Sequence, residues 1–367
     1  MATNHLREIE ALGQAVWLDN ISRALLEDGE LERLITEDGI SGVTSNPTIF
    51  DKAIAGSERY DEALADAARR GLDSRDTFFE LGFRDIRDGA DLLRPVFDET
   101  DGQDGYVSFE LPPELADDAD GSVEQAKLIR ARIDRPNVLI KVPGTEAGVQ
   151  AFEQLTADGV SVNVTLLFSV GRYEEIAEGY LRGLERRLEA GEPIDRLASV
   201  ASFFVSRVDG KVDKKLEELG RTELRGKAGV ANARVAYASF ERIFSGPRWE
   251  RLAAAGANVQ RPLWASTSTK NPEYPDTLYV DALIGPDTVN TMPDETIAAA
   301  RDHATAARTV DQDVDGARAH LDALREAGVD VDHIVGVELV EEGVASFAKS
   351  FDSMIESIGE KARAVAT

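Results

Sequence analysis

Eight short apolar or β-branched runs recur along the chain, and most are separated by longer polar stretches. In chain order the runs are Ala15–Asn20, Ser41–Asn46, Tyr106–Leu111, Val138–Pro143, Val160–Phe168, Ser199–Val205, Arg261–Ser266 and Thr277–Ala282. Between them lie patterns such as Val123–Ile133 and Tyr173–Ala190, in which apolar residues recur every three or four positions, as in amphipathic helices. Strands that alternate with helices predict a parallel sheet, and eight of them predict an α/β fold closed into a (β/α)8 TIM barrel.

The main alternative for such a chain is a doubly wound open sheet, which usually carries a glycine-rich phosphate loop after its first strand. The segment Val16–Leu26 has no such loop, so the barrel is favoured. No Pro-rich or Gly/Ser-rich linker divides the chain, and barrels regularly exceed the usual domain length. We therefore expect residues 1–367 to form one barrel domain.

Two segments exceed a minimal barrel. The stretch Lys211–Asn258 is predicted to form two or more helices between the sixth and seventh strands. The stretch Val337–Arg363 is predicted to form one long amphipathic helix. Its apolar side carries Val344, Phe347, Phe351, Met354 and Ile355. This helix either packs over the barrel or forms a dimer contact, so both a monomer and a homodimer remain open.

The composition excludes several kinds of protein. The chain has no cysteine, which excludes disulfides and thiol chemistry, and its four histidines lie far apart, so no metal site is predicted. No apolar run approaches the roughly 18 residues of a membrane span, and no secretory signal is visible, so we expect a cytoplasmic protein with no membrane contact. The formal net charge of −27 disfavours binding to nucleic acid or anionic lipid. A phosphate substrate would therefore need a local positive site.

Polar side chains stand at or near the ends of seven of the eight predicted strands. They are Asp19, Asn20, Thr44, Ser45, Asn46, Glu110, Lys141, Asn163, Thr165, Ser202, Arg207 and the segment Ser266–Lys270. The carboxyl ends of barrel strands form the active-site face of such enzymes, whereas a purely structural barrel fills inward positions with Val, Ile and Leu. This distribution favours an enzyme.

Lys141 is the most informative of these residues because it lies inside an apolar strand, VLIKVP. An ammonium group buried there is costly unless an acid pairs with it or the amine serves in chemistry. Two interpretations remain open: a structural salt bridge with Glu110 or Asp19, or an amine that attacks a carbonyl to form an imine. The same two carboxylates would supply the acid and base that imine chemistry needs.

Each of the other candidates has a plainer interpretation beside the functional one. Asp19 is either a catalytic carboxylate or a helix N-cap, and Glu110 either a catalytic carboxylate or a surface acid. Arg207 suits bidentate binding of a phosphate but would equally suit a salt bridge on the barrel rim. The loop 265–272 (ASTSTKNP) is either a phosphate cradle or a solvated loop.

Five segments resemble the transaldolase family, most closely its longer bacterial members. They are GVTSNPTIF (42–50), VLIKVPGT (138–145), NVTLLFS (163–169), SFFVSRVD (202–209) and WASTSTKNPEYPDTLY (264–279), in that order. The resemblance runs from about Trp17 through the C-terminal helix. It implies a cofactor-free, class I aldolase-like transferase of the pentose phosphate pathway. Such enzymes move a dihydroxyacetone unit from sedoheptulose 7-phosphate to glyceraldehyde 3-phosphate.

The resemblance also implies a role for each matching residue. Lys141 would form the imine with the ketose C2, and Glu110 would exchange protons through a water held with Thr165. Asp19 would take the proton of the C4 hydroxyl. The remaining positions would bind the substrate: Thr44, Asn46, Asn163 and Ser202 its hydroxyls, and Arg207 its phosphate.

Fructose-6-phosphate aldolase is the closest rival within this resemblance. It has a glutamine at the position of Glu110 and a tyrosine at the position of Phe204, so this chain matches the transferases. The transferases, however, usually carry a second phosphate-binding arginine after the seventh strand, where this chain offers Ser266 and Lys270. A third hypothesis, from another class, is a non-catalytic barrel that binds sugar phosphates or a protein partner.

Overall fold

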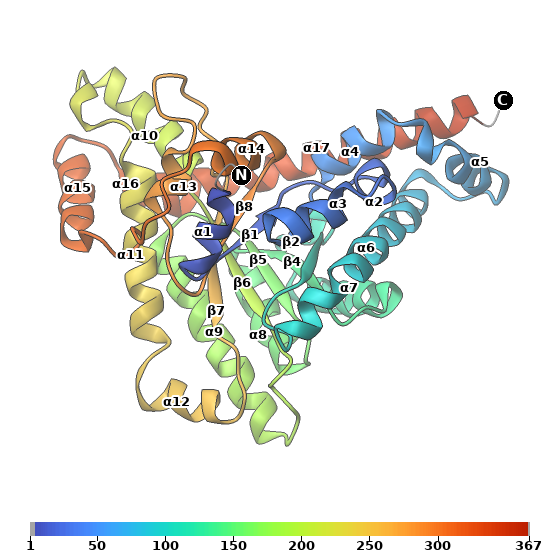
Figure 1. Ribbon diagram of the computed structural model, residues 1–367, viewed down its shortest axis with the longest axis horizontal. Helices are drawn as coiled ribbons and strands as arrows, with labels where there is room; N and C mark the ends of the chain where they lie inside the picture. The colour runs from blue at the N-terminus through green and yellow to red at the C-terminus, as the bar shows by residue number, and fades with distance from the viewer. Residues whose placement is uncertain (1–3, 366–367) are drawn as a thin grey trace.

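The fold is a closed barrel of parallel strands surrounded by helices (Figure 1). The computed structural model describes residues 4–365, and within them eight strands pair in chain order, with β8 closing onto β1. The strands are β1 Gln14–Leu18, β2 Ile40–Thr44, β3 Tyr106–Glu110, β4 Val138–Pro143, β5 Val162–Leu167, β6 Ser199–Phe204, β7 Gln260–Ala265 and β8 Thr288–Met292. The predicted TIM barrel is confirmed, and the open sheet is wrong.

Helices follow most strands, as predicted. Those before β6 are α1 His5–Ala11, α2 Arg23–Glu27, α3 Glu30–Arg33, α4 Pro47–Ala55, α5 Asp61–Arg69, α6 Ser74–Glu99, α7 Ala119–Ile133, α8 Glu146–Ala157 and α9 Val170–Glu189. Those after it are α10 Ser206–Glu218, α11 Ala228–Ile243, α12 Gly246–Ala254, α13 Leu278–Ala282, α14 Asp294–His303, α15 Val314–Glu326, α16 Val331–His333 and α17 Leu339–Val365. The helices predicted between the sixth and seventh strands are confirmed as α10, α11 and α12. No helix within residues 4–365 is long and apolar enough to cross a membrane.

The eighth predicted strand is wrong. Thr277–Ala282 contributes the short helix α13 instead, and the strand between β7 and β1 is Thr288–Met292. The Thr277 hydroxyl donates to the Asp281 carboxylate at 2.9 Å, and the Asp281 N–H donates to the Thr277 carbonyl at 2.9 Å. These local bonds close a helical turn despite the strand-forming side chains, because side chains of this kind compete with regular backbone pairing.

Alternation along each strand separates two apolar regions. Val138, Ile140 and Val142 on β4 belong to the large cluster that includes side chains of the surrounding helices. Leu139 belongs to a second cluster, which includes Trp17 and side chains of several other strands. Because side chains alternate between faces, Lys141 shares the inward face with Leu139. The inward positions are thus apolar lower in the barrel and polar near the carboxyl ends.

The C-terminal helix α17 runs along the top edge of the view in Figure 1, beside α4 and α5. It also contacts α6 and β5, and it is preceded by a π-helical turn at Ile334–Glu338. The predicted apolar side is confirmed at Phe351 and Met354, which are buried in the large cluster, and at Ile355, which packs against it. We therefore find α17 packed on the helices at the carboxyl-end face of the barrel.

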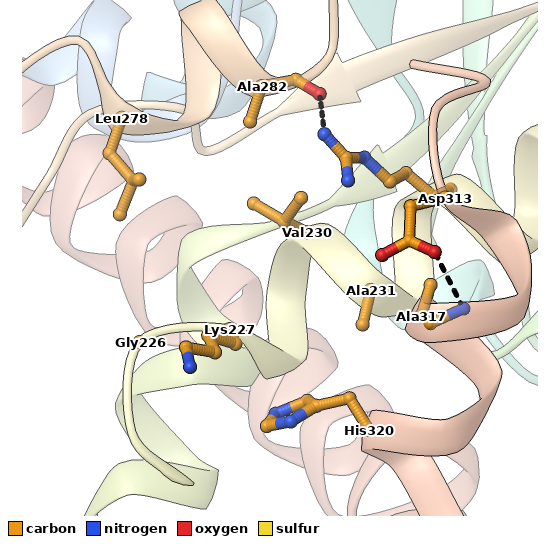
Figure 2. Close-up of a pocket in the computed structure, with 11 residues that line it drawn as sticks. Gly226, Lys227, Val230, Ala231, Leu278, Ala282, Asp313, Ala317 and His320 are labelled. Atoms are coloured by element: carbon orange, nitrogen blue, oxygen red, sulfur yellow. Dashed lines mark hydrogen bonds between the residues drawn. The ribbon is translucent and has the colours of Figure 1, made fainter. Parts of the chain in front are cut away.

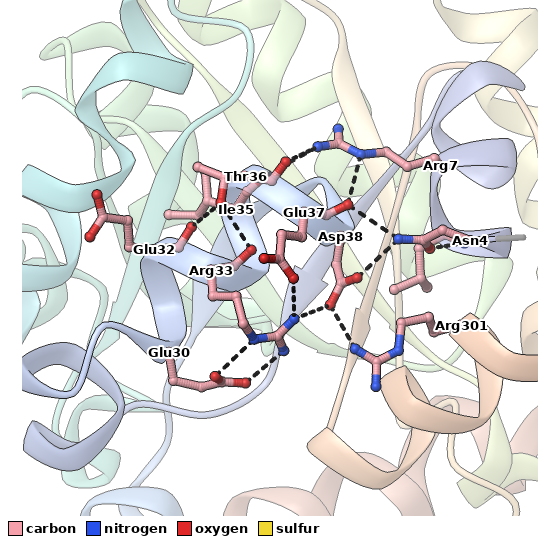
Figure 3. Close-up of polar contacts among 11 residues, drawn as sticks. Asn4, Arg7, Glu30, Glu32, Arg33, Ile35, Thr36, Glu37, Asp38 and Arg301 are labelled. Carbon is pink, nitrogen blue, oxygen red and sulfur yellow. Dashed lines mark hydrogen bonds and ion pairs between the residues drawn. The ribbon is translucent and has the colours of Figure 1, made fainter. Parts of the chain in front are cut away.

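The buried Asp38 carboxylate connects the start of the N-terminal helix α1 to α14, near the other end of the chain (Figure 3). Asp38 accepts hydrogen bonds from Asn4 at 2.9 Å, Arg33 at 3.3 Å and Arg301 at 3.1 Å. These residues lie at the start of α1, in α3 and in α14. The network therefore fixes α14, the helix that follows β8 in the chain. The last residues of β8 reach the cavity described next.

Candidate active site

A cavity of about 230 Å³ opens at the carboxyl ends of the barrel strands. It is lined by Asp19, Thr44, Asn46, Lys141, Thr165, Ser202, Phe204, Arg207, Ala265, Ser266, Ser268, Lys270, Thr291, Pro293, Glu295 and Phe347. All residues predicted for the site line this cavity except Glu110 and Asn163, which contact lining residues. Most side chains of the strand-end pattern therefore meet at one cavity, whereas Asn20 donates to the Asp294 carboxylate at 2.7 Å and does not line it.

Lys141 lies in the wall of this cavity on β4. Its side chain is only 8% exposed, and its ammonium donates to the Ser45 carbonyl at 3.0 Å and to Glu110 Oε2 at 3.2 Å. The pairing of β3 with β4 sets Glu110 directly beside Lys141 in register. The Phe347 ring of α17 has its centre 5.8 Å from Lys141 Nζ. This contact is the salt bridge of one interpretation and also supplies the carboxylate that imine chemistry needs in the other, so both interpretations of Lys141 remain open.

Glu110 is a buried carboxyl whose side chain is 10% exposed. Burial raises its pKa above the ordinary glutamate value, although the charge and hydrogen bond of Lys141 act in the opposite direction. A carboxyl with a raised pKa can carry a proton closer to neutral pH. Glu110 is therefore a candidate for proton exchange beside Lys141.

Asp19 follows β1 and accepts a hydrogen bond from the Thr44 hydroxyl at 2.6 Å. Thr44 Oγ1 also lies 2.6 Å from Thr291 Oγ1, so the two hydroxyls form a chain that ends on the carboxylate. Burial raises the Asp19 pKa, while the Thr44 hydrogen bond and the Lys141 charge lower it. The N-cap interpretation of Asp19 is wrong, because the cap of α2 is Ser22, whose side chain accepts from the Leu25 N–H.

A row of hydrogen bonds crosses the barrel beneath the cavity. The Ser202 hydroxyl donates to Asn163 Oδ1 at 2.6 Å, and Asn163 Nδ2 donates to the Ser108 hydroxyl at 3.1 Å. Above this row, Thr165 Oγ1 is buried and has no hydrogen-bond partner among the described residues. The pairing of β5 with β6 shifts register just after this point, and Leu166 adopts φ +59°. The irregular backbone therefore sits beside an unpaired hydroxyl at the cavity wall.

Asn46 begins α4 at the edge of the cavity. Its side-chain oxygen accepts the Ile49 N–H at 3.0 Å, which is the usual N-cap bond. The cap fixes the orientation of the amide group at the cavity wall.

The far end of the cavity is positively charged. Arg207 lies in the first turn of α10 rather than at the end of β6, and its guanidinium carbon is 5.1 Å from the centre of the Phe204 ring. Burial lowers its pKa, and the charges of Glu110 and Glu342 raise it. Lys270 donates to the Ser268 hydroxyl at 2.7 Å. Two cationic groups thus face the same end of the cavity.

Ser266 joins β7 to this positive end. Its φ of +55° is in the left-handed region, which is uncommon for a residue other than glycine. Its hydroxyl lies 2.8 Å from the Ser206 hydroxyl, and its carbonyl accepts the Ser206 N–H. Strained backbone of this kind persists where the surrounding structure holds it, and it is common at functional sites.

Four lining residues lie outside the predicted site: Thr291, Pro293, Glu295 and Phe347. Thr291 lies in β8 and Glu295 lies just after it, where the sequence analysis predicts no strand. The segment 285–293 (GPDTVNTMP), a β-branched run with turn residues around it, is the signal that could indicate this strand. Phe347 had been assigned only to the apolar side of the last helix. Among residues 4–365, no cluster of three His, Asp or Glu side chains could hold a metal ion.

Comparison with known proteins places the chain among enzymes of one family. The family model described as Transaldolase/Fructose-6-phosphate aldolase matches residues 16–358. A protein named Transaldolase from Parafrankia sp. (strain EAN1pec) is 49% identical over 360 residues, which cover 97% of each chain. Transaldolase 2 from Nostoc sp. (strain PCC 7120) is 46% identical over 376 residues, which cover 99% of each chain. The chain belongs to the transaldolase/fructose-6-phosphate aldolase family.

Proposed function

We propose that this protein is a transaldolase that moves a dihydroxyacetone unit from sedoheptulose 7-phosphate to glyceraldehyde 3-phosphate. The observation that carries the proposal is the contact of Lys141 with Glu110, 3.2 Å apart, where Lys141 lines a cavity together with Asp19 and Arg207. The names of the relatives support transfer as the reaction.

Imine formation is the first step in this proposal. The Lys141 amine adds to the C2 carbonyl of the ketose, and a proton must reach the C2 oxygen before it leaves as water. Glu110 supplies that proton and takes it back during hydrolysis, since burial keeps its pKa above the ordinary value. Thr165, with its unpaired hydroxyl, holds the water that connects the two groups.

Carbon–carbon cleavage is the second step. Asp19 removes the proton of the C4 hydroxyl, the C3–C4 bond breaks, and its electron pair moves into the iminium to give an enamine. Erythrose 4-phosphate leaves, and the enamine then attacks the aldehyde carbon of glyceraldehyde 3-phosphate, with Asp19 returning the proton. Hydrolysis of the new imine releases fructose 6-phosphate.

Positioning groups hold the substrate between these residues. Arg207 binds the phosphate, with Lys270 and Ser266 beside it at the same end of the cavity. Thr44, Asn46 and Ser202 bind hydroxyls of the dihydroxyacetone unit, and Asn163 orients Ser202 through its 2.6 Å hydrogen bond. Phe204 packs against the Arg207 guanidinium and limits its movement.

Borohydride trapping tests the mechanism directly. Reduction in the presence of fructose 6-phosphate should leave a stable adduct on Lys141, found by peptide mass analysis. Lys270→Met removes the other lysine of the cavity and should keep the adduct, whereas Lys141→Met should abolish it. An adduct on Lys270, or none at all, would refute the mechanism. The absence of any adduct would also favour a non-catalytic barrel that binds sugar phosphates.

Fructose-6-phosphate aldolase activity is the second candidate, because the matching family model includes both enzymes. In a transaldolase the enamine stays on the enzyme until it attacks an aldehyde. In the aldolase it is protonated, and dihydroxyacetone is released. Turnover of fructose 6-phosphate should require erythrose 4-phosphate if the protein is a transaldolase. Equal turnover without that acceptor would identify an aldolase.

The architecture around this site is proposed as one barrel domain that carries α17. The helix contacts α4, α5, α6 and β5, and Phe347 reaches the cavity from it. Either a monomer or a homodimer is compatible with a site that lies within one chain, and sedimentation equilibrium separates the two.

A further inference from the structure

A second and larger cavity lies outside the barrel (Figure 2). It has a volume of about 410 Å³ and is bordered by α11, α13 and α15. It shares no lining residue with the cavity at the barrel mouth. Its size falls within the range of about 300–1,000 Å³ that is typical of small-molecule sites.

Basic side chains gather at this cavity without direct ion pairs among the described residues. Among the described residues, neither Lys227 nor Arg234 has a carboxylate oxygen within 4.0 Å, although most arginines of the chain are in ion pairs. His320 Nε2 and Arg234 Nε are buried and have no hydrogen-bond partner in residues 4–365. The chain as a whole has a charge of −27, so unpaired basic groups around one cavity require a reason.

The two ends of the cavity differ in character (Figure 2). Lys227 and His320 lie together at one end. At the other end the Asp313 carboxylate caps α15 through the Gly316 N–H at 3.1 Å. Arg234 belongs to that second end, because it donates to the Ala282 carbonyl at 3.4 Å.

The wall between these ends is apolar. Val230 and Leu278 are partly exposed to solvent, and Ala317 lines the same surface. An apolar surface of this kind favours a ligand with a hydrocarbon body, because contact with it removes both from water. The acid at the far end repels a second anionic group, so one anionic end is expected.

We propose that this cavity is a second ligand site, which binds a small organic anion. The anionic group lies between Lys227 and His320, and the apolar body lies against Val230 and Leu278. Burial and the nearby Lys227 charge lower the His320 pKa, and the Asp213 charge acts in the opposite direction. The imidazole Nε2, which has no hydrogen-bond partner in residues 4–365, contributes a hydrogen bond to the ligand. Lys227 contributes the charge.

Fluorine NMR with p-fluorobenzoate tests the proposal. The probe has an anionic group and a compact apolar body, and p-fluorobenzyl alcohol has the same ring without the charge. We expect the acid to bind and the alcohol to bind at least about tenfold more weakly, as for loss of a charged hydrogen bond. The ring protons of His320 provide a second readout, because only three other histidines are present. Their signals should shift on binding, while those of His5, His303 and His333 should not.

Matched variants locate the probe. Lys227→Met should weaken binding about tenfold, and His320→Gln should weaken it and identify the shifted signal. Lys214→Met removes an exposed lysine outside the cavity and should leave the affinity unchanged. Ala317→Leu should fill part of the cavity and reduce binding without removing a charge.

Three results would overturn the proposal. Equal binding of the acid and the alcohol would show that no anion is recognised. Loss of binding in Arg207→Ala, with Lys227→Met unaffected, would place the probe in the barrel mouth. An unshifted His320 signal in the presence of saturating probe would show that the cavity is not occupied.

Discussion

Replacing Thr44 with valine removes the hydroxyl that donates to Asp19 while keeping the shape of the side chain. In the proposed mechanism Asp19 must be a carboxylate to accept the C4 hydroxyl proton. Burial already raises the Asp19 pKa, whereas the hydrogen bond from Thr44 lowers it by stabilising the carboxylate. Loss of this hydrogen bond therefore raises the Asp19 pKa further. The active, deprotonated enzyme then exists only at higher pH. We therefore expect the acidic limb of the pH–rate profile to move to higher pH.

The size of the change follows from the contact. A hydrogen bond to a charged group contributes about 1.5–3 kcal/mol, and about 1.4 kcal/mol corresponds to one pH unit in a titration. The limb should therefore move by roughly one to two pH units. Well above the limb, kcat/KM should fall by a factor that does not change with pH, because Thr44 also binds a substrate hydroxyl in the proposed mechanism.

The assay measures kcat/KM for fructose 6-phosphate with erythrose 4-phosphate as acceptor, over a range of about pH 5 to 9. Thr44→Ser keeps the hydroxyl and should leave the limb in place. Thr291→Val removes the second hydroxyl of the chain and should move the limb in the same direction by a smaller amount, because hydrogen bonds in series strengthen one another. A uniform loss of rate in Thr44→Val, with the limb unmoved, would show that Asp19 does not set it.

Three further changes test other parts of the structure. Glu110→Gln should slow imine turnover and increase the share of free dihydroxyacetone, and product analysis showing an unchanged ratio would leave Glu110 only a structural role. Gly42→Ala would place a Cβ atom 2.4 Å from Trp17 Cε2. It should cost about 1–3 kcal/mol of unfolding free energy, and an unchanged urea midpoint would contradict this packing. Arg23→Met removes the charged partner of the buried Asp85 carboxylate, 3.1 Å away in the native pair, and leaves the Tyr60 hydroxyl as a neutral donor to it, so it should cost about 3–5 kcal/mol. Burial raises the Asp85 pKa to about 6, so the loss should shrink in acid, where that carboxyl is protonated, and a pH-independent loss in thermal unfolding would refute the account.

Most of the fold was predictable because strands and helices of a barrel alternate with clear changes of period. Seven strands matched because their apolar runs are short and flanked by helical patterns. The eighth failed because α13 has strand-forming residues, while β8 carries Asn290 and two threonines among its five residues. Local side-chain hydrogen bonds in α13 and the closure of the sheet determine which of the two segments forms the strand. Residue types alone predict neither of them.

The site was predictable where chemistry and strand position coincide. Lys141 and Glu110 follow from their places in apolar strands, and strand pairing then brings them together. Phe347 could not be predicted as a lining residue, because its position depends on how a helix from the end of the chain packs over the barrel. The outer cavity likewise depends on how the helices pack. No sequence motif predicts that Lys227 and His320 lie near each other.

Arg207 shows how an acidic protein keeps a cationic group free of direct ion pairs at a proposed phosphate site. With 68 acidic residues against 41 basic ones, an exposed arginine would meet a carboxylate, as many on this surface do. Arg207 is instead partly buried, with the Phe204 ring against its guanidinium, and no carboxylate of the described chain lies within 4.0 Å of it. Glu110 and Glu342 act on it only through their charges, and they offset part of the desolvation that lowers its pKa. These acids compensate part of the cost of burying the Arg207 charge, and a bound phosphate would compensate the rest. The positive site is therefore kept by excluding direct ion pairs, and not by an excess of positive charge.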